Sequence, residues 1–471
     1  MEQPPLDLVG LVSHLPNNWL IGYNTHQFTQ LVEQLYLELI QISKQQNSPK
    51  IILAERNPVR FLAGFIAATA AGCPVFLCNP DWVKAEWQQV FELVQPDIIW
   101  GNLSVVNCQL FAAKKEEKKA DYRQIMIPTG GSSGEIRFAI HTWETLTASV
   151  QGFIEYFDIK TVNSFCVLPL YHVSGLMQFV RSFITGGKLA ILPFKALEAG
   201  EKCEVEPADF FISLVPTQLQ RLLDRTPQWL SQFQTVLLGG ATAWHELLEQ
   251  ARHHEIRLAL TYGMTETASQ IVTLKPEDFL KGNNSCGQVL PHAKVKICNP
   301  NGKMLGANQT GIITINADSL ALGYYPDTSF VRENQRILQP DDLGFFDEQG
   351  YLNIVGRNSN KIITGGENVF PSEVEAAIRS TNLVSDICVI GIPDSHWGQA
   401  VTAVYVPSHP EVDTETLQTA LLDKLSNFKR PKYWIPVESL PRNAQGKINR
   451  EQIQQIAISW HPDRSNLAAS Q

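Results

Sequence analysis

The chain has 471 residues, and at roughly 100–200 residues per domain this length predicts two to four folding units. Hydrophobic residues make up 44% of the chain and charged residues 18%, as in ordinary globular proteins. Acidic residues outnumber basic ones by 47 to 38, which gives a formal net charge of −9. This balance argues against nucleic acid as the main partner, because a phosphate backbone binds a basic face.

The sequence carries no signal for export or for a membrane span. Its eight cysteines are scattered without a Cys-x-x-Cys pair, which is typical of free thiols in a reducing compartment. The N-terminal stretch MEQPPLDLVG lacks the basic segment and apolar core of a secretory signal. The longest apolar run, residues 61–77, is shorter than the ~20 residues that a membrane helix needs. We therefore expect a cytoplasmic protein.

Helical and strand patterns alternate through the first 280 residues. Hydrophobic periodicity predicts a helix over 29–42, a strand over 51–54, a helix over 61–72 and a strand over 74–78. In segment 208–225 a strand ends, Pro216 turns the chain, and an amphipathic helix follows. This alternation predicts parallel βαβ layering.

The pattern changes twice further along the chain. Between about 285 and 357, short strands separated by Gly and Asn turns predict an antiparallel subdomain. Beyond a polar, glycine-rich segment, a helix with Ser372 as its N-cap and two more strands predict a small α+β domain. The expected fold class is thus α/β. A large N-terminal domain of layered α/β subdomains and an antiparallel β-subdomain spans 1–356, a hinge spans 357–361, and a small mobile C-terminal domain spans 362–471.

A glycine-serine loop, TGGSSG at 129–134, is the first candidate for a binding site. Its glycines allow backbone N–H groups to converge, and Thr129, Ser132 and Ser133 add hydroxyl donors, which suits the β- and γ-phosphates of a nucleotide. No Gly-Lys-Ser/Thr follows, so this is not a Walker loop. Taken alone, such a loop also fits a plain turn, and its interpretation depends on the other motifs.

Six further motifs accompany this loop. They are PLYHVSGL (169–176), LLGGATAWHE (237–246), TYGMTETASQ (261–270), PDDLGFFDEQGYL (340–352), GRNSNKIITGGENVFPSEVE (356–375) and PRNAQGKINR (441–450). The ordered set resembles the core motifs of the adenylate-forming family, which includes acyl-CoA synthetases, peptide-synthetase adenylation domains and luciferases. The resemblance covers about residues 125–450. Within the family, the motifs are most similar to the o-succinylbenzoate–CoA ligases of menaquinone and phylloquinone synthesis.

The resemblance implies a two-step reaction that uses ATP, Mg²⁺ and CoA. A carboxylate attacks the α-phosphate of ATP to give acyl-AMP and pyrophosphate, and a thiol then displaces AMP to give a thioester. The expected substrate is o-succinylbenzoate. Three alternatives remain open: a ligase for another aryl or fatty acid, a stand-alone enzyme that adenylates an acid and loads a carrier protein, and a non-catalytic nucleotide-binding relative.

The resemblance also implies residue roles in nucleotide binding. The pyrophosphate loop comprises Thr129, Gly131, Ser132, Ser133, Gly134 and Arg137. The adenine pocket comprises Gly239, Gly240, Ala241, Tyr262, whose ring would stack on the base, and Gly263. Thr265 would bind the α-phosphate, Glu266 would hold Mg²⁺, and Asp342 would accept from the ribose hydroxyls. Arg357 would bind ribose and phosphate and begin the hinge.

The resemblance also implies a catalytic lysine, a path for CoA and a site for the acid. Lys447, on a glycine-containing loop, would reach the α-phosphate and the acid carboxylate when the small domain closes. Gly365 and Gly366 would let pantetheine pass close to the backbone. The acid site would contain His172 and Ser174, together with Arg181 nine residues beyond His172.

Arg181 is the residue on which the choice of acid depends. It lies between the apolar stretches MQFV and SFI, and a buried arginine without a partner is costly. We therefore expect it to bind the aromatic carboxylate of o-succinylbenzoate while the succinyl carboxylate faces the phosphates. A homodimer is the expected assembly.

The chain departs from the family pattern at several positions. In the loop, Gly130 replaces a serine, Ile136 a proline and Arg137 a lysine, so that a planar guanidinium carries the positive charge. In the hinge, Ser359 stands where the family commonly has Asp or Lys. The hydroxyls that would face the phosphates are mostly retained, so we expect the loop still to bind pyrophosphate.

Overall fold

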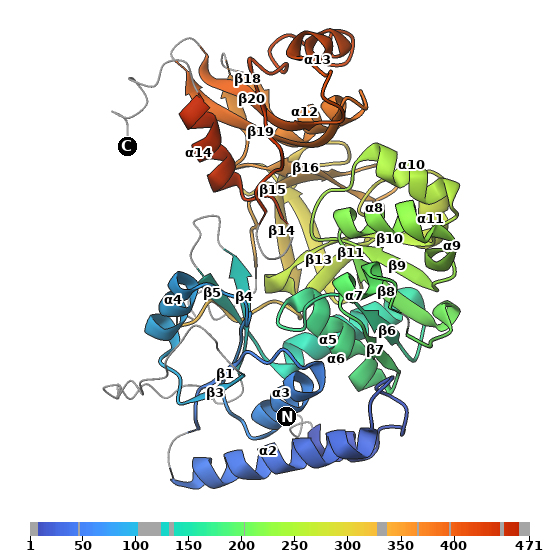
Figure 1. Ribbon diagram of the computed structural model, residues 1–471, viewed down its shortest axis with the longest axis vertical. Helices are drawn as coiled ribbons and strands as arrows, with labels where there is room; N and C mark the ends of the chain where they lie inside the picture. Colours follow the sequence, from blue (N-terminus) through green and yellow to red (C-terminus); the bar gives the residue numbers. More distant parts are fainter. Residues whose placement is uncertain are drawn as a thin grey trace.

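The computed structural model describes residues 8–45, 48–101, 124–130, 136–201, 203–326, 337–364, 367–394, 397–442 and 447–460. Within these ranges the chain forms four β-sheets. Three sheets belong to a large domain, and the fourth belongs to a small domain at the top of Figure 1. This mixed α/β architecture, with a large N-terminal and a small C-terminal domain, confirms the predicted fold class.

The first sheet has the strand order β3-β1-β2-β4-β5 and is covered by helices on both faces. Its elements are α1 (Leu8–Ser13), α2 (Thr25–Gln45), β1 (Ile51–Leu53), α3 (Pro58–Ala70), β2 (Val75–Leu77), α4 (Lys84–Val94), β3 (Ile98–Trp100), β4 (Ile125–Gly130) and β5 (Ile136–His141). Successive strand residues point to opposite faces, so Ile51 and Leu53 join the core of α2 and α3, whereas Ile52 packs on the α4 side. Because both faces are buried, these strands read as continuous apolar runs.

The second sheet has the order β12-β11-β10-β9-β8-β6-β7. The elements here are α5 (Trp143–Phe157), β6 (Asn163–Cys166), α6 (Val173–Thr185), β7 (Leu189–Ile191), α7 (Phe194–Glu198), the short 3₁₀ helix η1 (Pro207–Asp209), β8 (Phe210–Leu214), α8 (Pro216–Arg225), α9 (Pro227–Leu230), β9 (Thr235–Leu238), α10 (His245–His253), β10 (Leu258–Met264), the 3₁₀ helix η2 (Thr265–Thr267), β11 (Ser269–Thr273), α11 (Pro276–Leu280) and β12 (Gln288–Val289). Strands β6–β10 run parallel to one another. Strand β11 pairs antiparallel with β10, and β12 pairs antiparallel with β11. Pro216 begins α8 directly after β8, as predicted, because a helix does not need the N–H of its first residue.

The third sheet is antiparallel, as predicted. It comprises β13 (Ala293–Cys298), β14 (Gly311–Ala317), β15 (Asp342–Phe346) and β16 (Leu352–Arg357). The small domain contains β17 (Ile362–Thr364), β18 (Glu367–Val369), α12 (Pro371–Arg379), β19 (Val384–Asp394), β20 (Gly398–Pro407), α13 (Thr414–Ala420), β21 (Tyr433–Pro436) and α14 (Arg450–Trp460). Its sheet has cores of its own on both faces, one with α12 and α13 and the other with α14.

The prediction for the start of α12 was wrong by two positions. The helix begins at Pro371 with Phe370 as its N-cap, and no side chain caps it. Proline favours the first helical position, which leaves Ser372 inside the first turn. Its hydroxyl instead donates to the carbonyl oxygen of Val355 in β16, at 2.9 Å. Ser372 therefore links the small domain to the last strand of the large one.

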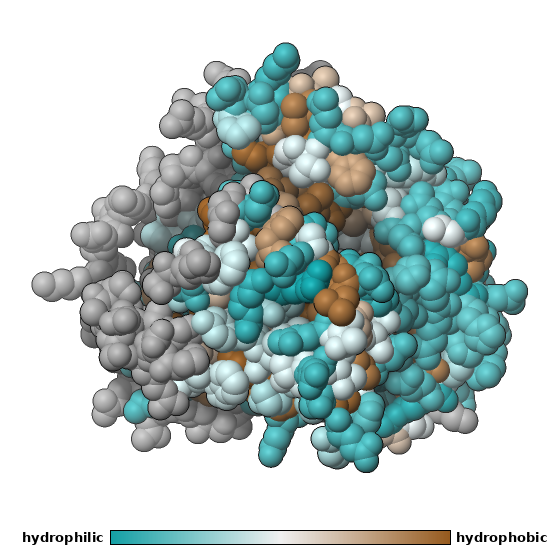
Figure 2. All heavy atoms as spheres, turned by 90° about the horizontal axis from the view of Figure 1, so that it is seen from above, coloured by the Kyte–Doolittle hydropathy of each residue, from teal (hydrophilic) through white to brown (hydrophobic). Residues whose placement is uncertain are grey.

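The surface on the small-domain side is mostly hydrophilic, and hydrophobic residues show at scattered positions and in a recess (Figure 2). Among the described residues, no helix combines the length and the apolar character needed to cross a bilayer.

Candidate active site

The glycine-serine loop joins the ends of the hairpin formed by β4 and β5. Thr129 pairs with Arg137 in the antiparallel register. Gly131, Ser132, Ser133 and Gly134 lie outside the described residues. At the base of the loop, the Thr129 hydroxyl donates to Oε1 of Glu266 at 3.5 Å. The hairpin therefore places Thr129, the first residue of the motif, next to the predicted magnesium ligand.

Glu266 lies in η2, directly after β10, among groups that orient its carboxylate. The Tyr324 hydroxyl donates to Oε1 at 2.5 Å, and burial followed by the charge of Glu266 raises the pKa of Tyr324. The guanidinium carbon of Arg137 lies 6.0 Å from the centre of the Tyr324 ring. The described residues contain no group of three or more acidic, His or Cys side chains that could bind a metal by themselves. A single carboxylate fits Mg²⁺, which is commonly held by one or two carboxylates together with substrate phosphates.

The backbone carbonyl of Thr265 is hydrogen-bonded to a buried histidine, His141, which was not predicted from the sequence. The Nε2 atom of His141 lies 2.8 Å from the Thr265 carbonyl oxygen, to which it donates, and Nδ1 lies 3.0 Å from the Thr145 hydroxyl. Burial lowers the pKa of His141 to about 4, while the contact with the Thr265 carbonyl opposes the shift. The ring is therefore neutral near pH 7 and fixes the turn that carries Thr265 and Glu266.

This neutral burial predicts a loss of stability in acid. Between pH 6.5 and about 4 the unfolded chain binds a proton at His141 that the folded chain excludes, so stability falls as the pH falls through this window. The full shift corresponds to roughly 3 kcal/mol, at about 1.4 kcal/mol per pKa unit. In urea titrations between pH 7.5 and 5, His141→Gln should lose less stability on acidification than the wild type. The exposed His245→Gln is the matched control, and equal acid slopes for His141→Gln and the wild type would contradict the prediction.

Tyr262, Asp342 and Arg357 meet at the junction of the second and third sheets. The Tyr262 hydroxyl donates to Oδ2 of Asp342 at 2.8 Å, and Nε of Arg357 lies 3.3 Å from Oδ1. Asp342 and Arg357 face each other in the register of β15 and β16. Burial, and then the negative charge of Asp342, raise the pKa of Tyr262. A carboxylate held between these two donors has oxygen lone pairs left to accept hydrogen bonds from sugar hydroxyls.

The predicted adenine-pocket glycines lie where the backbone is crowded or strained. A Cβ at Gly239 would lie 2.5 Å from the Thr261 hydroxyl oxygen, and Gly240 has a φ of +82°. A Cβ at Gly263 would lie 2.1 Å from the carbonyl oxygen of Ser269, where the register of β10 and β11 shifts. Ala241 follows these glycines and is exposed. Larger residues at Gly239 and Gly263 would push neighbouring strands apart.

Lys447 brings the small domain to this site. Lys447 is exposed as a residue, but its ammonium is partly shielded from water. This desolvation lowers the pKa of the ammonium, and the positive charge of Arg357 lowers it further. The negative charges of Glu266 and Asp342 oppose this shift. These couplings place Lys447 within electrostatic reach of three charged side chains of the large domain. Gly365 and Gly366 lie outside the described residues.

The predicted acid-site residues lie at the start of α6 and, in the case of Arg181, in its second half. His172 is the N-cap residue of this helix, and Ser174 is an exposed residue in its first turn. Burial, and then the positive charge of Lys447, lower the pKa of His172 to about 3. Its Nε2 atom is buried and has no hydrogen-bond partner. His172 is therefore neutral near pH 7 and lies within electrostatic reach of Lys447.

Arg181 is buried, with 3% of its surface exposed. One Nη atom donates to the Ser269 hydroxyl at 3.1 Å and to Oε1 of Gln270 at 3.0 Å, and the guanidinium carbon lies 4.3 Å from the centre of the Phe153 ring. Burial lowers its pKa to about 9. Among the described residues, no carboxylate forms an ion pair with Arg181.

His292 completes an acid-side cluster with Arg181, Ser269 and Gln270. Burial lowers the pKa of His292 to about 4; the charge of Asp318 opposes this shift and that of Arg181 reinforces it. Both of its ring nitrogens, Nε of Arg181 and Nε2 of Gln270 are buried without hydrogen-bond partners. Buried polar atoms normally have partners, so the cluster has unused capacity to bind a polar group. Sequence reasoning had assigned only Arg181 of these four.

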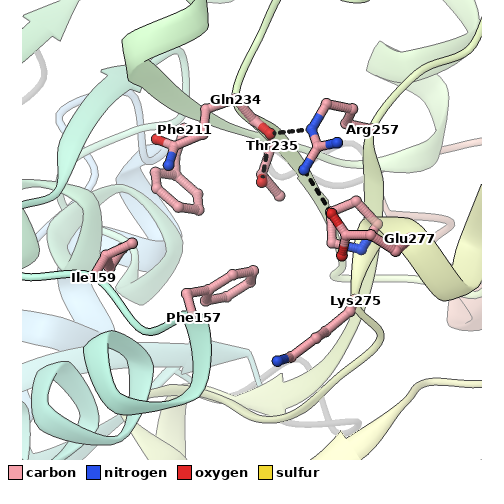
Figure 3. Close-up of a pocket in the computed structure, with 9 residues that line it drawn as sticks. Phe157, Ile159, Phe211, Gln234, Thr235, Arg257, Lys275 and Glu277 are labelled. Atoms are coloured by element: carbon pink, nitrogen blue, oxygen red, sulfur yellow. Dashed lines mark hydrogen bonds and ion pairs between the residues drawn. The ribbon is translucent and has the colours of Figure 1, made fainter.

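A separate cavity of about 140 Å³ lies at the end of α5 and is lined by none of the predicted site residues (Figure 3). Arg257 enters it, but its guanidinium donates to the Gln234 carbonyl oxygen at 2.8 Å and pairs with Glu277 at 2.7 Å. The Lys275 ammonium lies 5.2 Å from the centre of the Tyr156 ring. Arg257 thus has a carboxylate partner in this cavity, whereas Arg181 has none among the described residues.

Comparisons with known proteins identify the family of the chain. The family described as "AMP-binding enzyme" matches residues 26–325, and the "AMP-binding enzyme C-terminal domain" matches residues 373–447. A 2-succinylbenzoate–CoA ligase of Oceanobacillus iheyensis is 35% identical over 338 residues, which cover 70% of this chain and 68% of the relative. A ligase of the same name from Bacillus cereus is 30% identical over 426 residues, which cover 86% and 88%.

Solved structures of similar enzymes share the fold of this chain. The o-succinylbenzoate CoA synthetase of Bacillus subtilis, in complex with its acyl-adenylate intermediate, superposes with a TM-score of 0.83 at 26% identity and covers 96% of this chain and 99% of that one. ATP-bound MatB from Rhodopseudomonas palustris has a TM-score of 0.79 at 21% identity, covers 96% and 98%, and supports the fold alone. On these matches and on the site described above, the chain belongs to the family of AMP-binding enzymes.

Proposed function

We propose that this protein is an ATP-dependent o-succinylbenzoate–CoA ligase. The observation that carries the proposal is the electrostatic coupling of Lys447 to Glu266 and to the Asp342–Arg357 pair. It is supported by the buried Arg181, which has no carboxylate partner among the described residues. The named relatives and the structural neighbour that binds an acyl-adenylate support the same reaction.

In the first step, the succinyl carboxylate attacks the α-phosphate of ATP and pyrophosphate leaves. Negative charge builds up on the α-phosphate oxygens, and Lys447 and the N–H and hydroxyl groups around Thr265 would neutralise it. Glu266 would hold Mg²⁺, which supplies charge neutralisation to the phosphates. Thr129, Arg137 and the loop between β4 and β5 would bind the leaving pyrophosphate. Asp342 and Arg357 would position the ribose.

On the acid side, Arg181 would bind the carboxylate that is not activated. A guanidinium binds a carboxylate through two parallel N–H bonds, and a dianionic acid would supply the negative charge that the described residues do not. Ser174 and His172 would line the path from Arg181 to the phosphates. A monocarboxylic acid would leave the guanidinium buried without a counter-charge, which is costly.

The second step, attack of the CoA thiol on the acyl-adenylate, requires Lys447 to withdraw. We propose that residues 1–356 and 362–471 are the two moving parts, that 357–361 is the hinge, and that Gly365 and Gly366 then line the pantetheine path. The homodimer, the cytoplasmic location and the absence of a nucleic-acid partner stay predictions. Size-exclusion chromatography with light scattering tests the first of them.

A product assay tests the function directly. Purified protein is incubated with ATP, Mg²⁺, CoA and o-succinylbenzoate, in parallel with benzoate, coumarate and a medium-chain fatty acid, and thioester and pyrophosphate are measured. Thioester formed from o-succinylbenzoate alone is the expected result. Turnover of another acid alone would keep the reaction and overturn the substrate. Adenylate without thioester would indicate a carrier-loading enzyme, and no pyrophosphate with any acid would refute the proposal.

The pH dependence of the first step should carry the signature of Lys447. Its ammonium is the active form, and its pKa lies below the ordinary 10.5, so kcat/KM for pyrophosphate release should fall as the pH rises, beginning below that value. Lys447→Arg keeps the charge and should move the decline to higher pH. A decline at the same pH in both proteins would show that another group titrates.

A further inference from the structure

One carboxylate of the small domain joins the loop that carries Lys447 to the contact between the domains. Asp386 lies in β19, and its Oδ1 accepts from Arg379 and from the backbone N–H of Ile387, each at 2.9 Å. Its Oδ2 accepts from Arg442. The three side chains are mostly buried, with between 17% and 30% of their surface exposed. One carboxylate therefore contacts two arginines.

The first limb of this network leads to Lys447. Arg442 forms an isolated antiparallel bridge with Ile448, the residue directly after Lys447. The backbone N–H of Asn449 donates to the carbonyl oxygen of Pro441 at 2.8 Å, which closes the same segment. The carboxylate that holds Arg442 thus also holds the strand pair from which Lys447 projects.

The second limb leads to the large domain. Arg379 ends α12, and its guanidinium carbon lies 5.0 Å from the centre of the Trp244 ring. Trp244 is the N-cap residue of α10, and α12 and α10 lie beside each other at the domain boundary (Figure 1). A guanidinium over an indole ring is an attractive contact, and Asp386 holds the guanidinium in place for it.

We propose that Asp386 is a positioning residue for the first half-reaction: its carboxylate fixes the Lys447 segment through Arg442 and docks the small domain on Trp244 through Arg379. This inference rests on the proposed function, since it concerns the step in which Lys447 acts. In the second half-reaction Lys447 is not needed, so the network matters for one step only. Misplacing a catalytic group by about 1 Å can cost ~10²-fold in rate, even when the mutation is distant.

Asp386→Asn tests the first limb. The variant keeps the size of the side chain but removes the negative charge that Arg379 and Arg442 both contact. Adenylate formation, measured as pyrophosphate release, should fall roughly 10–100-fold, while thioester formation from pre-made acyl-adenylate should stay within about threefold of the wild type. Asp386→Glu should recover part of the loss. Equal losses in both half-reactions, or none, would overturn the proposal.

Glu373→Gln is the matched control, because it breaks another ion pair of the small domain, that of Glu373 with Lys429. Among the described residues, neither side chain of this pair forms an ion pair with the large domain or contacts the Lys447 segment. Glu373→Gln should leave both half-reactions unchanged. Trp244→Leu removes only the docking surface and should slow adenylate formation alone. No effect of Trp244→Leu on either step would refute the second limb.

Hydrogen–deuterium exchange provides a readout that does not depend on turnover. In Asp386→Asn, amides of the Ile448–Asn449 segment should exchange faster than in the wild type, and in Glu373→Gln they should not. Unchanged exchange in Asp386→Asn would overturn the positioning role, even if the wild-type protein turned over no acid. Conversely, an inactive wild type with the expected exchange difference would refute the proposed function and leave the structural link intact.

Discussion

Replacing Lys447 by alanine should slow adenylate formation roughly 10³-fold and leave thioester formation from pre-made acyl-adenylate within about threefold of the wild-type rate. The ammonium of Lys447, in the small domain, lies within electrostatic reach of Arg357, Glu266 and Asp342 of the large domain. Its charge is useful where negative charge builds up on the α-phosphate, and the second step has no such need. Rapid-quench measurement of the two half-reactions separates the effects.

The matched control is Lys429→Ala, which removes another lysine of the small domain, one that is paired with Glu373 away from the site. Both half-reactions should be unchanged in this variant. Similar losses in the two half-reactions of Lys447→Ala would assign Lys447 to the stability of the small domain rather than to the chemistry of the first step.

Replacing Arg181 by leucine should lower kcat/KM for o-succinylbenzoate roughly 10²–10³-fold, mainly through KM. Losing a buried, hydrogen-bonded charge pair with the ligand costs about 2–5 kcal/mol, and each 1.4 kcal/mol is a factor of ten. The change should not unfold the protein, because the guanidinium is buried without an ion-pair partner among the described residues, and a hydrophobic residue in its place removes that desolvation cost. Steady-state kinetics and the thermal midpoint test both expectations.

A substrate analogue sharpens this prediction. 4-Oxo-4-phenylbutanoate retains the succinyl carboxylate but lacks the one on the ring, so its kcat/KM should be nearly the same in the wild type and in Arg181→Leu. If both acids lost the same factor, Arg181 would act on the shape of the pocket and not on the second carboxylate.

Much of the fold could be predicted because local patterns and global packing agree. The continuous apolar runs of β1 and β2 follow from burial on both faces of a parallel sheet. Pro216 at the start of α8 is a local rule that the tertiary structure respects. The same proline preference holds at Pro371, which takes the first position of α12, so the prediction of Ser372 as N-cap was wrong. The serine hydroxyl found its partner in another domain instead.

Some residues of the candidate site could likewise be predicted from the sequence, and others could not. Residues in glycine-rich or charged motifs, such as Glu266 and Lys447, could be found from the sequence because the motifs resemble a known family. Tyr324 could not, because it lies 58 residues from Glu266 in the chain and its role depends on a single tertiary hydrogen bond. Gln270 and His292 were missed for the same reason, since only the fold places them beside Arg181.

The separation of the two domains has a consequence for engineering. The acid-side cluster belongs to the large domain: Arg181 lies on α6, Ser269 and Gln270 lie on β11, and His292 lies just before β13. Lys447 and Asp386, in contrast, belong to a small domain that has hydrophobic cores of its own. Under the proposed function, the choice of acid and the switch between the half-reactions thus depend on different domains. Redesign of the acid preference can be confined to positions around Arg181 and Gln270, and the machinery that switches between the two half-reactions can be inherited unaltered.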